Sequence, residues 1–216
     1  MKSTIIENSS DSFADFHDGD WIKEIFTLSD GSKIENIIEE FHAHWWGSSR
    51  MFVLPWLLVK GVRNASAVES EYTLDDVWAK YLNNNAFQGA LWKIAENSYC
   101  SLYYAYENLL VAISLEYSDR KVRVTDRDFT AQLNNILGES ITSKVWSSSK
   151  IILAKEIRNA IVHNGGKVTD KLVKLEYENI SDDGDVSISA SDTRDLYNML
   201  KPLVKKLVKR VVAVNS

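Results

Sequence analysis

A short stretch near residue 160 combines the residue types that cleavage of a phosphodiester without a metal ion needs. Arg158, Asn159 and His163 lie within two turns of a periodic helical pattern, and Gly165 and Gly166 follow them. An arginine carries a permanent planar cation whose donors fit phosphate oxygens. A histidine is the side chain that exchanges a proton near neutral pH. The stretch is therefore the candidate site of this chain.

On an ideal helix these polar side chains do not share one stripe. At about 100° per residue, Asn159 and His163 are neighbours on one face, with Glu156 one turn behind. Arg158 lies about 140° from His163. Its side chain must therefore reach around the helix, or a second surface must close the gap. We interpret the motif in one chain as half of a site, completed when a second copy of the chain faces it.

The same spacing also has a purely structural explanation. A histidine in the last turn of a helix interacts favourably with the negative end of the helix dipole. The pair Gly165-Gly166 is typical of a helix C-cap. An arginine such as Arg158 can also pair internally with an acid, either Glu107 or Glu156, and then the motif only holds the fold together.

The elements around the motif predict an all-α bundle with a small β-hairpin between the motif helix and the last helix. Only 9 Gly and 2 Pro occur in 216 residues, which favours helices over loops. The motif helix is predicted from about Ser149 to His163 or Asn164. Further helices are predicted from Ser32 to a break or bend before Pro55, over 74–82, over about 86–117, from Thr125 to Gly138, and from Ser191 or Asp192 onward. Residues 21–28 are predicted as a short strand, and 171–180 and 186–189 as the hairpin.

Three segments are predicted along the chain. Residues 1–33 form a partly flexible N-terminal extension, because residues 1–20 are polar and rich in Ser and Asp. Residues 34–85 form N-terminal helices that pack on the bundle, and residues 86–216 form the helical domain that carries the motif. The length is that of one domain with an extension.

Composition limits the partners and the compartment. The net charge of −5 argues against a surface that is basic throughout and built for duplex nucleic acid, but it is compatible with a small basic cleft. The single Cys100 fits a reducing compartment, and the N-terminus has no apolar run of signal-peptide length. We therefore expect a cytoplasmic protein without a membrane span. His42 and His44 are two apart, a poor spacing for metal ligands, so no metal is expected. The sequence has no Walker loop, GxGxxG or GxSxG motif, and no cofactor is expected.

The full pattern Glu-x-Arg-Asn-x-x-x-His-Asn-Gly-Gly, placed after a long helix rich in Tyr and Glu, resembles the HEPN family (higher eukaryote and prokaryote nucleotide-binding domains) of the Arg-x4-His type. The resemblance covers about residues 86–211. It implies a four- or five-helix bundle that dimerises so that two motif helices face each other across a cleft. Many members are metal-independent endoribonucleases of toxin–antitoxin, abortive-infection or other phage-defence systems.

The resemblance also implies roles for individual residues. Arg158 holds the scissile phosphate, His163 acts as the acid or base in attack by the RNA 2′-hydroxyl, and Asn159 orients the site. Glu107, Glu156 and Asn164 are expected to support these three residues. The expected partners are RNA, a second copy of the chain, and an antitoxin or another defence-system protein.

Two features depart from the family pattern or leave an alternative open. One HEPN subset, controlled by partner nucleotidyltransferases, has a Tyr two residues after the His, and this chain has Gly165 there. That mode of control is therefore not expected. Some members of the family are non-catalytic, so the alternative is a module that binds RNA, a nucleotide or a protein in the same polar cleft without cleavage.

Overall fold

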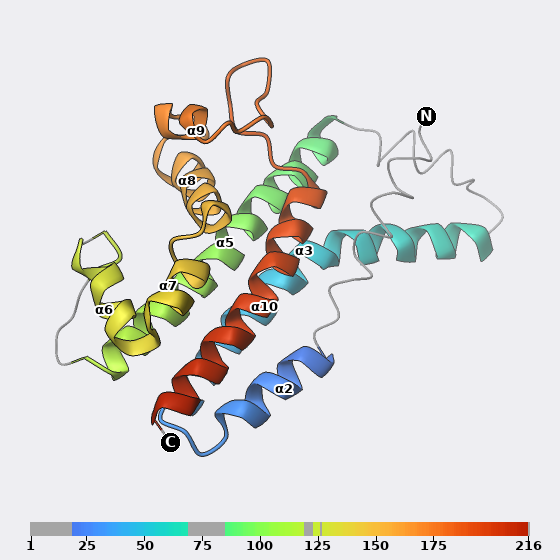
Figure 1. Ribbon diagram of the computed structural model, residues 1–216. Coiled ribbons are helices and arrows are strands. Elements are labelled where there is room, and N and C mark those ends of the chain that lie inside the picture. The colour runs from blue at the N-terminus through green and yellow to red at the C-terminus, as the bar shows by residue number, and fades with distance from the viewer. Residues whose placement is uncertain (1–18, 69–84, 119–122, 126, 216) are drawn as a thin grey trace.

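The computed structural model describes residues 19–68, 85–118, 123–125 and 127–215. Within them the chain is mostly helical, which confirms the prediction of an all-α protein (Figure 1). The helices are α2 (Gly19–Ser29), α3 (Glu35–Val68), α5 (Asn85–Glu116), α6 (Asp128–Leu137), α7 (Glu139–Val145), α8 (Ser149–His163), α9 (Asp170–Lys174) and α10 (Ala190–Asn215). The helix predicted over 74–82 lies outside the described residues. Among the described helices, none combines the length and the apolarity that crossing a lipid bilayer requires.

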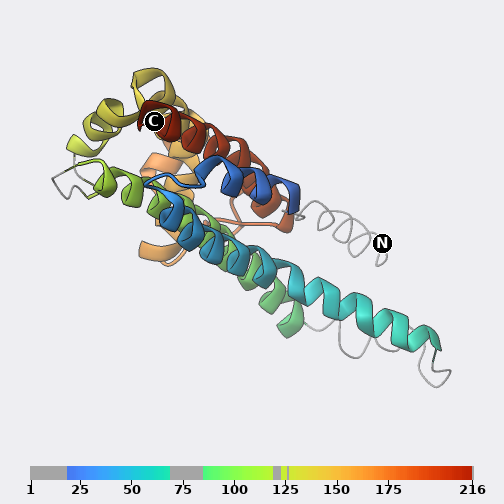
Figure 2. The same cartoon turned by 90° about the horizontal axis from the view of Figure 1, so that it is seen from below.

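The two longest helices, α3 and α5, pack against each other (Figure 2). The sequence predicted that this helix either bends or ends before Pro55. An end at that point is wrong, because α3 continues through Gly47 and Pro55 to Val68. The buried positions Phe41, Trp45 and Phe52 keep a helical repeat on both sides of Gly47. Packing of that stripe outweighs the roughly 1 kcal/mol that a glycine costs inside a helix.

Residues 21–28 are helical, so the predicted strand there was wrong. Trp21, Ile25 and Leu28 recur at three- and four-residue spacing, and Ile25 is fully buried. The indole Nε1 of Trp21 donates a hydrogen bond to the carbonyl oxygen of Lys201 at 3.1 Å. The second half of the predicted N-terminal extension therefore packs on α10 and α3 as part of the helical body.

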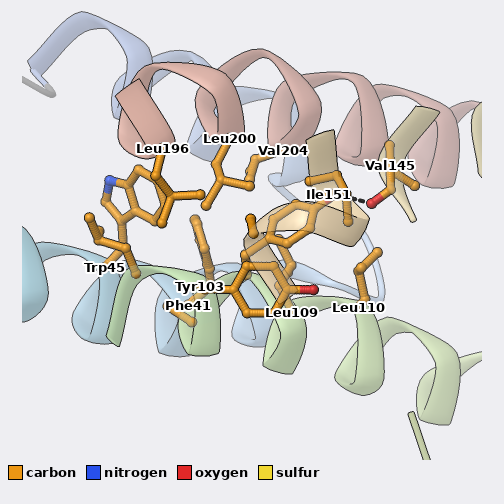
Figure 3. Packing of buried hydrophobic residues seen from close by; sticks show 14 of the residues in the cluster. Phe41, Trp45, Tyr103, Leu109, Leu110, Val145, Ile151, Leu196, Leu200 and Val204 are labelled. Carbon is orange, nitrogen blue, oxygen red and sulfur yellow. Dashed lines mark hydrogen bonds between the residues drawn. The ribbon is translucent and has the colours of Figure 1, made fainter. Parts of the chain in front are cut away.

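The core lies between α3, α5 and α10, with α7 and α8 at one end (Figure 3). Trp45 of α3 stacks on Tyr197 of α10, with ring centroids 5.0 Å apart. The Tyr106 hydroxyl of α5 donates to the carbonyl oxygen of Val145, the dashed contact in Figure 3. That bond ties α5 to the end of α7, immediately before the chain turns into α8.

The predicted hairpin between the motif helix and the last helix was also wrong. Within the described residues that region has only two isolated bridges, Lys167 with Asp185 and Ile180 with Val186. Residues Asp170–Lys174 instead form the short helix α9, whose first turn is capped by Thr169 Oγ1 accepting from the Leu172 N–H at 3.3 Å. The cap and the fully buried Leu172 outweigh the strand pattern of the segment.

Candidate functional site

The motif helix α8 has the predicted bounds and carries the motif residues in its C-terminal half. Its N-cap is Ser148, whose side chain accepts from the Ile151 N–H. The buried positions are Ile151, Ala154, Ile157 and Ala160. Of the predicted stripe, Ile157 and Ala160 are buried, whereas Leu153 and Ile161 are half-buried. Arg158 and Asn159 are half-buried beside them, and His163 is exposed.

Arg158 is paired across the bundle with Glu107 of α5. Guanidinium Nη2 donates to Oε2 of Glu107, and the two side chains are only 15% and 7% exposed. The Arg158 guanidinium carbon also lies 5.8 Å from the centre of the Tyr103 ring, one turn before Glu107 on α5. An ion pair this far from solvent fixes the direction of the guanidinium plane. The second nitrogen, Nη1, is thereby directed along α8 rather than into the bundle.

Arg158 Nη1 contacts both of the other predicted catalytic residues. It donates to Oδ1 of Asn159 at 3.0 Å and lies 3.4 Å from Nε2 of His163. Of the two arrangements that the helical angles left open, the structure therefore has the first, in which the long arginine side chain reaches around the helix to His163. Arginine only donates hydrogen bonds, so this contact is a hydrogen bond only when Nε2 of His163 carries no proton.

The end of α8 leaves the imidazole at the surface. The N–H groups of Asn164 and Gly166 both donate to the carbonyl oxygen of Ala160, at 3.1 and 3.0 Å. Gly165 and Gly166 have φ values of 61° and 88°, which a side chain would strain. His163 is the last residue of the helix and Asn164 is its C-cap, and the two glycines directly after it supply the left-handed backbone that ends the helix.

The remaining predicted residues lie apart from this cluster. Glu156 pairs with Lys171 of α9, with Nζ and Oε1 3.5 Å apart. It is two positions from Arg158, and about 200° around the helix, so its carboxylate faces α9 instead. Asn164 is exposed, and its backbone serves the cap. The structure thus joins Glu107, Arg158, Asn159 and His163 and leaves Glu156 and Asn164 outside.

Several polar atoms around the ion pair have no hydrogen-bond partner among the described residues. They are Oε1 of Glu107, Nε of Arg158 and the hydroxyl of Tyr103. Burial, and then the charge of Glu107, raise the pKa of Tyr103, so its hydroxyl stays protonated. Buried polar groups are nearly always satisfied in proteins, so three such atoms around one ion pair distinguish this place from ordinary packing. The sequence signal for Tyr103 is its position four residues before Glu107 on one helix face.

Within the part of the chain that the structure describes, no group of three His, Cys, Asp or Glu side chains is placed to hold a metal ion. The cluster itself offers one carboxylate, one cation, one amide and one imidazole.

Cys100 lies one turn before Tyr103 on α5 and gives a chemical test of this packing. Burial raises the pKa of its thiol to about 11, although the nearby Arg158 cation acts in the opposite direction. An exposed cysteine has a pKa of about 8.5, so about half of it is thiolate at a pH of about 8.5. At the same pH, roughly 0.3% of Cys100 is thiolate. We expect iodoacetamide to alkylate the folded protein about 100-fold more slowly than the protein in guanidinium chloride. Equal rates, measured by mass spectrometry, would contradict this packing of α5.

Comparisons of the chain with protein-family models, with curated proteins and with solved structures find no match. The resemblance to the HEPN family therefore rests on the motif and on its helical setting.

Proposed function

We propose that this protein is a HEPN-like, metal-independent endoribonuclease of toxin or phage-defence type. The observation that supports the proposal best is the 3.4 Å approach of Arg158 Nη1 to Nε2 of His163 at an exposed helix end. A cation and a proton-exchanging group thus stand side by side at a position that a phosphate can reach. The ion pair of Glu107 with Nη2 of Arg158 orients the guanidinium group before RNA binds.

The proposed reaction uses the nucleophile that RNA already contains. The 2′-oxygen attacks the adjacent phosphorus, its proton passes to a base, and the bond from phosphorus to the 5′-oxygen breaks as that oxygen takes up a proton. The products end in a 2′,3′-cyclic phosphate and a 5′-hydroxyl. Arg158 stabilises the charge on the phosphate oxygens, and His163 transfers a proton. Asn159 keeps Arg158 Nη1 next to the imidazole.

One chain provides one exposed imidazole in this cluster, whereas the reaction needs both a base and an acid. We therefore place the active site at a dimer interface, where His163 of one chain and His163 of its copy take the two roles. A C2 dimer brings the same surface of both chains together, so an exposed end of α8 can meet its own copy. In this arrangement Arg158 and His163 of each chain enter the site as a preassembled pair.

The test of the activity is digestion of total RNA and of tRNA by the wild-type protein in excess EDTA, with analysis of the new ends. Fragments with 2′,3′-cyclic phosphate and 5′-hydroxyl ends are expected. RNA that stays intact at protein concentrations where the dimer is present would refute the nuclease proposal, and cleavage that EDTA abolishes would refute its metal independence.

Mixing experiments test whether the site is shared between two chains. A ninefold excess of the His163→Ala variant leaves roughly one wild-type chain in ten paired with another wild-type chain once subunits have exchanged. The cleavage rate per wild-type chain is then expected to fall about tenfold. Native mass spectrometry verifies the exchange, and an equal excess of an unrelated protein is the control. An unchanged rate per wild-type chain would show that each chain carries a complete site.

The pairing of Arg158 with Glu107 favours one alternative, a module that binds RNA, a nucleotide or a protein without cleaving RNA. A carboxylate already neutralises most of the guanidinium charge, which suits recognition by hydrogen bonds from Nη1 more than strong charge stabilisation. Saturable RNA binding that requires Arg158, measured by fluorescence anisotropy, combined with intact RNA in the digestion assay, would support this alternative.

A further inference from the structure

A hollow lies on another side of α8 from the Arg158 and His163 cluster. It has a volume of about 430 Å³ and lies between α8, the first turns of α10 and the segment after α9. Figure 1 shows that segment leading from α9 to the start of α10. The walls are largely apolar: Leu153 and Ile157 come from α8, and Leu196 and Met199 from α10. This size and this lining are those of a site for a small organic molecule.

A tyrosine with a mostly buried side chain lines this hollow. Tyr99 of α5 is only 4% exposed, and it lines the hollow together with Tyr177 and Asp192. The Tyr177 hydroxyl donates to the carbonyl oxygen of Ser187 at 3.0 Å. The Tyr99 hydroxyl, in contrast, has no hydrogen bond to a residue in the described part of the chain, and it does not belong to the buried polar atoms that are closed off from solvent. A hydroxyl that has no protein partner and is accessible at a hollow is suited to a ligand that completes its hydrogen bonding.

Charged groups at the hollow are mostly acidic. Glu176, Glu178, Asp192 and Asp195 line it, against the single cation Lys150. Two of these carboxylates already contact other groups of the protein. Asp192 accepts from Ser189 and Asn179 at the start of α10, and Asp195 lies 3.5 Å from Arg194.

Glu176 and Glu178 remain for a ligand. Both are exposed, and neither forms an ion pair with another described residue. The local charge therefore favours a cation over an anion.

We propose that this hollow binds a small organic cation, an amine or guanidinium group carried on an apolar body. The apolar body fills the space between Leu153, Ile157 and Met199. The cationic group donates hydrogen bonds to the Tyr99 hydroxyl and to the carboxylates of Glu176 and Glu178. An anion of the same shape meets a net negative wall, and a neutral molecule leaves the carboxylates without a partner.

The test uses 2-phenylethylamine as the probe, with 2-phenylethanol and 3-phenylpropionate as neutral and anionic molecules of similar shape. Titration followed by protein NMR is expected to show saturable binding of the amine, with shifts at Tyr99 and Met199. The alcohol is expected to bind about tenfold more weakly and the acid not measurably. Equal affinity for all three molecules, or no binding of the amine, would overturn the proposal.

Variants locate the binding on the named residues. Tyr99→Phe removes only the hydroxyl and is expected to weaken amine binding about threefold to tenfold. The double variant Glu176→Gln/Glu178→Gln is expected to weaken it about fivefold, because both carboxylates are solvent-exposed. Glu139→Gln, an exposed acid at the start of α7, is the matched control and leaves the affinity unchanged. Binding of tetralysine but not of 2-phenylethylamine would overturn the proposal in favour of a basic protein segment.

Discussion

Replacing His163 by alanine is expected to lower the rate of RNA cleavage about a thousandfold while leaving the protein folded. A positioned acid or base contributes about 10² to 10⁴ to a rate, and both roles in the proposed dimer fall to this residue. The side chain is exposed, and its described contact is the one with Arg158. Its removal therefore opens no cavity in the core. The effect on stability is expected to stay within about 1 kcal/mol, the usual size of a charge interaction with the end of a helix.

The measurement is a single-turnover cleavage rate on tRNA in EDTA. His44→Ala is the matched control, because His44 is also an exposed helical histidine but lies on α3. The control is expected to cleave at the wild-type rate. Thermal unfolding followed by circular dichroism shows whether each variant is folded. If a folded His163→Ala protein cleaved RNA as fast as the wild type, the imidazole would have no part in the reaction and the assignment of the site would fail.

The sequence predicts the motif helix because every signal that defines α8 is local. Ser148 caps its start, an apolar repeat runs through Ile157, and Gly165 with Gly166 ends it. The same holds for the long helix α5, whose apolar repeat extends over many turns. Where local signals conflict with packing, the predictions fail. Residues 21–28 are rich in the aromatic and β-branched residues that favour a strand. They form a helix instead, with Ile25 buried and Trp21 packed on the core, where α2 contacts α3 and α10.

The contact between Arg158 and His163 illustrates a different limit. Helical angles describe where Cβ atoms point, and by that measure the two residues lie on different faces. An arginine side chain is long enough to bridge the difference, and its final direction depends on Glu107, a residue 51 positions away. The sequence identified both residues as candidates and named Glu107 and Glu156 as possible partners of Arg158. It did not decide between those two acids or predict the conformation, because a pairing across the bundle exists only after α5 and α8 have packed.

Replacing only one partner of the Arg158–Glu107 ion pair by an apolar residue is expected to lower the free energy of unfolding by about 3 kcal/mol. Both side chains are withdrawn from water, so Arg158→Met leaves Glu107 as a buried charge without its partner, and Glu107→Leu leaves the guanidinium in the same position. The double variant removes both charges and fills the space with apolar groups. Its stability is expected to return to within about 1 kcal/mol of the wild type, since such replacements are often neutral. The free energies come from urea unfolding of the four proteins.

The same cycle on the surface pair Lys205–Glu24 serves as the control. Its nitrogen and oxygen atoms are 2.6 Å apart, but the side chains are 36% and 40% exposed, and Lys209 is a second partner of Glu24, so a much smaller coupling is expected. A similarly small coupling for Arg158 and Glu107 would contradict the buried pair.

The double variant also separates structure from chemistry. It restores the fold without restoring a cation beside His163. If this stable protein cleaves RNA at the wild-type rate, Arg158 serves only the packing of α5 on α8. If it is folded and inactive, the pair holds Arg158 in place for the reaction, because stability alone has then been shown to be insufficient.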